Sequence, residues 1–169
     1  MRAFLIACAL AAPATAAADN NIGLADLGLH VIGAGIQHAT SRNIAWQVDL
    51  DYYSPWTEML HQGNSINDVV GAVVRVRPMF YYLEAGYGPW LSPFVQGGIG
   101  FGVVSAGRHA GPVFATGVSL GYSFVIRRVV LAIGVGVQYQ YANFEATDVK
   151  TPSFSGLWPH ADLMVGYAF

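Results

Sequence analysis

Residues 129–142 read VVLAIGVGVQYQYA, and this stretch alternates between two kinds of side chain almost without error. The odd positions carry valine, leucine, isoleucine and finally two tyrosines, whereas the even positions carry mostly alanine, glycine and glutamine. A period of two predicts a β-strand whose two faces meet different surroundings. One face is large and apolar, and the other is small or uncharged. This pattern is typical of a strand with lipid on one side and the crowded interior of a narrow barrel on the other.

The same alternation recurs along most of the chain. It predicts further strands at residues 44–53, 69–82, 91–104, 112–125 and 157–169.

The stretch before them is harder to interpret. In residues 21–39, NIGLADLGLHVIGAGIQHA, the apolar face switches near Gly33-Ala34-Gly35. Either these glycines bend one strand through a bulge, or two short strands meet there. Barrels of this kind have an even number of strands. We therefore expect an all-β, antiparallel up-and-down transmembrane β-barrel of about eight strands, of which the sequence shows seven directly.

Composition favours a membrane barrel over a soluble β-sandwich. The chain is 54% hydrophobic and 11% charged, whereas about 25% charged residues is typical of soluble proteins. The solvated face of a sandwich should be rich in lysine, glutamate and threonine, but the second face here carries glycine, alanine, serine and glutamine. Lys150 is the only lysine in the sequence, and no basic stripe indicates nucleic-acid binding.

The first residues have the pattern of an export signal. A positive start is followed by the apolar run Ala3–Ala12 and then by small residues, which predicts a cleaved secretory signal peptide over residues 1–18. Residues 19–169 would then form one outer-membrane barrel domain. Residues 5–8 resemble a lipoprotein cleavage box, but only seven residues precede Cys8, so we expect Cys8 to be removed with the signal. The mature chain would contain no cysteine and no disulfide.

Segment lengths indicate which ends of the strands point outward. Barrels of this kind have short periplasmic turns and longer external loops, and their chain ends lie in the periplasm. We therefore expect external loops at residues 55–67, 105–111 and 144–156, and periplasmic connections at 41–43, 83–90 and 126–128.

Four charges fall on the predicted inner face of two neighbouring strands: Asp49, Asp51, Arg75 and Arg77. Charges in a poorly solvated interior must be paired or hydrated. They could form a salt-bridge plug or a charged constriction in a small pore. We favour the plug, because side chains normally fill an eight-stranded barrel.

A second polar group occupies the inner face of the last two strands and consists of Gln138, Gln140, His160 and Asp162. It could handle protons or bind a metal, but a polar network that fills the lumen is the simpler interpretation. His61 and His109 fall in expected external loops, and the histidines lack the spacing of metal ligands. We expect no metal and no cofactor.

The export signal, the alternating segments and the ending Val165-Gly166-Tyr167-Ala168-Phe169 together resemble the small outer-membrane barrels of the OmpX type and of the OmpA membrane domain. The resemblance covers residues 19–169 and is architectural. It implies a monomer surrounded by outer-membrane lipid in a Gram-negative cell envelope. The final Gly166, Tyr167 and Phe169 resemble the signal that the outer-membrane assembly machinery reads on the last strand.

The strongest enzyme alternative is a lipid-hydrolysing barrel. Residues 91–107, LSPFVQGGIGFGVVSAG, are similar in character to lipid A deacylases, which carry a His-x-Ser pair on a late strand because a serine nucleophile needs a nearby imidazole base. At the comparable place this chain reads VQYQY over residues 137–141, with neither residue. We therefore predict no catalytic residues.

Since a fold does not specify an activity, the sequence supports only a general function. We expect a porin-like barrel with a filled lumen and a structural or surface-interaction role through its external loops. The first alternative is a narrow pore for ions or small solutes, and the second is a lipid-modifying barrel enzyme.

Overall fold

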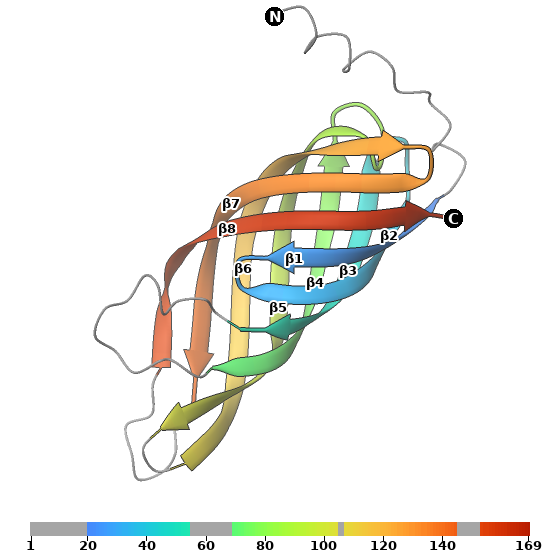
Figure 1. The fold of residues 1–169 in the computed structure, drawn as a ribbon. Helices are drawn as coiled ribbons and strands as arrows, with labels where there is room; N and C mark the ends of the chain where they lie inside the picture. Colours follow the sequence, from blue (N-terminus) through green and yellow to red (C-terminus); the bar gives the residue numbers. More distant parts are fainter. Residues whose placement is uncertain (1–19, 55–68, 105–106, 145–152) are drawn as a thin grey trace, which may run out of the picture.

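The computed structural model describes residues 20–54, 69–104, 107–144 and 153–169. Eight antiparallel strands form a closed barrel in which each strand pairs with the next and the last pairs with the first (Figure 1). The all-β up-and-down barrel expected from the sequence is confirmed. The strands are β1 (Asn21–Gly28), β2 (Val31–Ala39), β3 (Ile44–Tyr53), β4 (Val70–Tyr81), β5 (Gly88–Val104), β6 (Gly107–Ile126), β7 (Val129–Asn143) and β8 (Ser153–Ala168).

The predicted signal peptide at residues 1–18, the loop at 55–67 and His61 lie outside the described residues. No helix among the described residues is long and apolar enough to span a membrane.

The strands are strongly staggered around the barrel. Leu24 of β1 pairs directly with Gly166 of β8. Following paired residues the other way round, from Leu24 through β2 to β7, leads to Gly156, which lies ten residues before Gly166. Such a stagger tilts the strands against the barrel axis, and with eight strands the interior is just wide enough for side chains.

The stretch 21–39 forms two short strands, not one bulged strand. β1 and β2 are joined by Leu29 and His30, and the outward face changes from odd to even positions there. The glycines at 33 and 35, which the sequence suggested as the switch, lie inside β2. At the turn, the Nε2 of His30 lies 3.1 Å from the carbonyl oxygen of Pro159 on β8.

Three expected connections are shorter than the sequence indicated. β6 begins at Gly107 and β8 at Ser153, so both strands extend into the expected external loops. His109 therefore lies in a strand and not in a loop. Glycine and serine at 105–111 read as turn residues, but the backbone ladder continues to the pair of Val104 and Gly107. On the other side, β5 begins at Gly88, within the expected connection 83–90. Figure 1 shows β5 to β8 reaching well beyond β1 and β2.

The outside of the barrel carries many large apolar side chains. Leu50, Leu120 and Val135 are 66%, 60% and 57% exposed, respectively. Inside, the layers follow the inner face of β4, where Val73 is followed by Arg75 and Arg77 and then by Met79. Apolar clusters lie on both sides of the charges: Val31, Tyr53, Val69, Val73, Val113, Ala142 and Phe144 toward the loop end, and Ala45, Met79, Tyr81, Trp90, Ala132 and Met164 toward the chain ends.

Candidate functional site

The four predicted inner charges of β3 and β4 come together in the middle of the lumen. Asp49 lies opposite Arg75 in the strand register. The Nε of Arg75 donates to the Oδ2 of Asp49 at 3.3 Å, and its Nη2 lies 3.3 Å from the Oδ2 of Asp51. The side chains of all three residues, and that of Arg77, are fully buried.

Two further carboxylates reach the arginines from the opposite wall. The Nη1 of Arg77 donates to the Oδ2 of Asp162 on β8 at 2.8 Å, and the Nη1 of Arg75 donates to the Oδ1 at 3.2 Å. Asp26 on β1 pairs with both arginines through its Oδ2, at 3.1 Å from the Nη2 of Arg77. The two arginines thus tie the β1–β8 closure of the barrel to β4.

His160 and Gln47 complete the group. The Nε2 of His160 lies 2.9 Å from the Oδ2 of Asp162, and its ring packs on Phe94 with centroids 4.6 Å apart. The Nε2 of Gln47 donates to the Oδ1 of Asp49 at 2.8 Å. We refer to the ionisable members together as the buried charge cluster: Asp26, Asp49, Asp51, Arg75, Arg77, His160 and Asp162.

Asp26 was not among the inward-facing charges predicted from the sequence. Its signal was its position between Ala25 and Leu27, which both face outward and therefore turn Asp26 inward. That signal could be used only after β1 had been recognised as a separate strand.

The second predicted polar group is divided between two levels of the lumen. His160 and Asp162 belong to the buried charge cluster, whereas Gln140 accepts a hydrogen bond of 2.9 Å from the hydroxyl of Tyr53. Gln138 and Gln140 are buried opposite Trp158 and Gly156, respectively, on the loop side of the charges. They therefore line the lumen on the loop side of the buried charge cluster and do not surround His160.

The residues predicted to carry the assembly signal lie at the seam with β1. Gly166 is opposite Leu24, and Tyr167 is opposite Gly23. Tyr167 and Phe169 are exposed, and the backbone N–H of Phe169 donates to the carbonyl oxygen of Asn21 at 3.0 Å.

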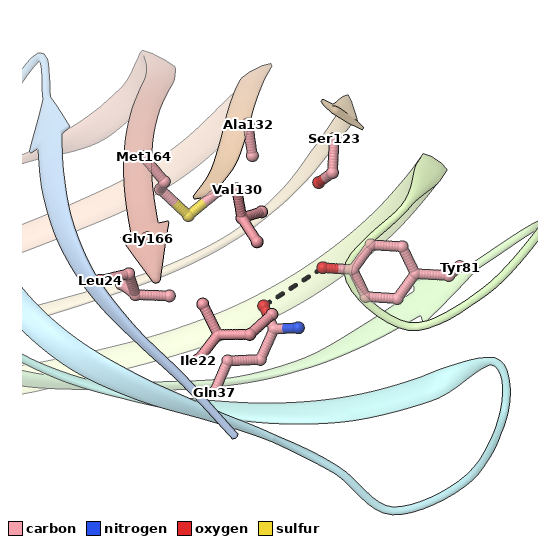
Figure 2. Close-up of a pocket in the computed structure, with 9 residues that line it drawn as sticks. All are labelled: Ile22, Leu24, Gln37, Tyr81, Ser123, Val130, Ala132, Met164 and Gly166. Atoms are coloured by element: carbon pink, nitrogen blue, oxygen red, sulfur yellow. Dashed lines mark hydrogen bonds between the residues drawn. The ribbon is translucent and has the colours of Figure 1, made fainter. Parts of the chain in front are cut away.

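A small cavity lies nearer the chain ends than the cluster and has a volume of about 10 Å³. Figure 2 shows Gln37, Tyr81 and Met164 around it, with the hydroxyl of Tyr81 donating to the Oε1 of Gln37 at 3.2 Å. The amide nitrogen of Gln37 has no hydrogen-bond partner among the described residues. The cavity has room for about one water molecule, which this amide could bind.

The burial of the charged side chains favours a sealed plug. A water-filled channel through the buried charge cluster would leave some of its side chains accessible, but the side chains of both arginines and all four aspartates are fully buried. Among the described residues, no group of three or more histidine, cysteine, aspartate or glutamate side chains is arranged to hold a metal ion.

No protein-family model matches the sequence, and neither a curated protein nor a solved structure shows significant similarity to it. The functional interpretation therefore rests on the barrel and on the contrast between its two faces.

Proposed function

We propose that this protein is an integral outer-membrane β-barrel of a Gram-negative envelope, with a side-chain-filled lumen and a structural or surface-interaction role. The observation that carries the proposal is the inverted distribution of polarity. Leu50 points outward and is 66% exposed, whereas its neighbours Asp49 and Asp51 point inward and are buried. In water this arrangement would expose apolar surface and bury charge, but in lipid it places both groups favourably.

The height of the apolar surface supports a membrane location. On β6, Phe114 and Phe124 face outward ten residues apart, with Val118 and Leu120 between them. At about 3.3 Å per residue and a tilt of about 40°, ten residues span roughly 25 Å along the barrel axis. That is about the height of the apolar band on outer-membrane barrels, which aromatic residues flank on both sides.

The lumen supports a filled barrel in preference to a pore. The arginines and carboxylates of the buried charge cluster pair with one another, and apolar layers lie on both sides of them. The same pairing supports a structural lumen over a catalytic one. Closure between β1 and β8 leaves no free sheet edge along that seam, which supports a monomer.

The surface-interaction role draws on the unequal strand lengths. β5 and β6 pair out to Val104 and Gly107, whereas the ladder of β6 with β7 begins at Val113 and that of β5 with β4 ends at Phe101. The end of this hairpin therefore extends past its neighbouring strands. Such a projection is suited to contacts outside the membrane.

The proposal is tested by expressing the full chain in a Gram-negative host and separating the envelope. We expect it in the outer-membrane fraction, with a gel mobility that changes when the sample is heated, as for a barrel that stays folded in detergent. Recovery as a soluble protein with one mobility, heated or not, would contradict the proposal.

A further inference from the structure

The buried charge cluster is not electrically balanced. It contains four carboxyl groups, from Asp26, Asp49, Asp51 and Asp162, but only two guanidinium groups. If all four acids were ionised, two negative charges would be in excess. A protonated His160 would offset only one of them. Because an unpaired charge is poorly tolerated in a buried interior, a group usually takes up a proton instead.

The four carboxylates are not equally stabilised. Asp162 contacts Arg75, Arg77 and His160. Asp49 accepts hydrogen bonds from Gln47 and Arg75. Asp26 accepts from both arginines through one oxygen.

Asp51 differs from the other three acids. Its only ion-pair contact among the described residues is the Nη2 of Arg75 at 3.3 Å, and neither of its oxygens accepts a hydrogen bond there. The residue is only 1% exposed. A buried carboxylate without hydrogen bonds is the one for which ionisation is least favourable.

The surroundings of Asp51 favour a proton over a bound cation. The charged groups that act on it are Arg75 and Arg77 on β4, Asp49 on its own strand and Asp162 on β8. Asp26 on β1 pairs with the same two arginines, and His160 on β8 contacts Asp162. On β2, Gly33 lies directly opposite, and the Oδ1 of Asp51 occupies the space where a side chain would begin. The cavity near Tyr81 is not lined by Asp51 (Figure 2). A proton needs no such space.

We propose that Asp51 is a proton-binding site in the lumen, and that its carboxyl group is a neutral acid at neutral pH. The proton removes one excess negative charge, so that the two arginines have three carboxylates to neutralise. Loss of this proton in alkaline medium would place a second uncompensated charge beside Asp49 and weaken the plug. This assignment concerns the interior and stands whether or not the outer face meets lipid.

The test is infrared spectroscopy of the folded full chain, with aspartate labelled with carbon-13 at the side-chain carboxyl. A protonated carboxyl group gives a carbonyl stretching band distinct from those of carboxylates. At neutral pH we expect one such band, shifted by the label and lost as the pH is raised. Asp51→Asn should fold like the parent, because an amide resembles the neutral acid in size and charge, and it should abolish the band. Glu84→Gln, in the β4–β5 connection, should leave the band unchanged.

Two results would overturn the proposal. The first is the absence of any label-sensitive band in the parent protein at neutral pH, which would mean that all four acids are ionised. The second is a band that persists in Asp51→Asn, which would place the proton on another residue. If Asp51→Asn fails to fold, the isotope shift and the pH titration of the parent decide whether an aspartic acid carries the proton, and the failure itself counts against a neutral Asp51.

Discussion

Gly33 of β2 lies directly opposite Asp51 of β3, and a β-carbon on Gly33 would lie 2.7 Å from the Cα of Asp51 and closer still to its Oδ1. The relationship repeats two residues along, where Gly35 faces Asp49 and its β-carbon would lie 2.9 Å from the Cγ of Asp49. The glycines of β2 therefore provide the space that the carboxylates of β3 occupy. The buried charge cluster therefore needs residues without a side chain at positions 33 and 35.

This pairing predicts that Gly33→Ala and Gly35→Ala each destabilise the barrel. The added methyl group must displace a carboxylate from its arginine or push the strands apart, and overpacking of this kind costs about 1–3 kcal/mol. Gly97→Ala is the matched control, because its β-carbon would meet only the carbonyl oxygen of Val113, at 4.0 Å. Urea unfolding of the protein folded in detergent measures all three. Equal stability of the three variants would contradict the close packing of β2 on β3.

The same glycines show why the sequence predicted most of the fold but misplaced the boundary between β1 and β2. Strands such as β3 and β7 alternate so regularly that their faces follow from the period of two. The β1–β2 turn consists of Leu29 and His30, neither of which is a typical turn residue, whereas Gly33 and Gly35 look like a bend. These glycines leave space for the carboxylates of β3. This role depends on the register of β2 with β3, which the sequence does not reveal.

The site could be predicted only in part for a similar reason. The alternation of strand faces predicted that one side of the sheet carries Asp49, Asp51, Arg75 and Arg77. The structure brings all four together. Contacts across the lumen depend on the stagger of the barrel, which alternation does not reveal.

The contact between Arg77 and Asp162 makes a second prediction. Arg77→Ala and Asp162→Ala should each lower the free energy of unfolding by about 3–5 kcal/mol, because each leaves a charge buried without its partner. The double variant should lose less than the sum of the two single losses, since the residues share one contact. The measurement is a double-mutant cycle by urea titration. Strictly additive losses would show that the two residues act independently.

Complete burial of the charges predicts that the lumen does not conduct. In planar lipid bilayers the parent protein should give no steady ion current, because the apolar layers around Tyr53 and Met79 close both sides of the charged layer. An ion-selective current in the parent would instead favour the narrow-pore alternative.

The outward face makes a prediction about added charge. Leu120→Arg places a cation near the middle of the proposed apolar band and should cost about 2–4 kcal/mol in a lipid bilayer. Ala110→Arg is a control on the same strand, because this exposed residue lies in the projecting part of β6, before its ladder with β7 begins. It should cost at most about 1 kcal/mol. Equal costs at the two positions would argue against a lipid-facing surface at Leu120.

The central claim, that this barrel meets lipid with its outer wall, is tested most directly by spin labels. Residues 19–169 contain no cysteine, so single cysteines at Leu120, Ile133 and Val135 can carry a nitroxide, with Ala110 as the projecting control. The measurement compares collisions of each nitroxide with oxygen, which dissolves in lipid, and with a water-soluble nickel chelate. We expect the first three labels to be accessible to oxygen and protected from nickel, and the label at Ala110 to show the reverse. Nickel access at Leu120, Ile133 and Val135 equal to that at Ala110 would contradict the account.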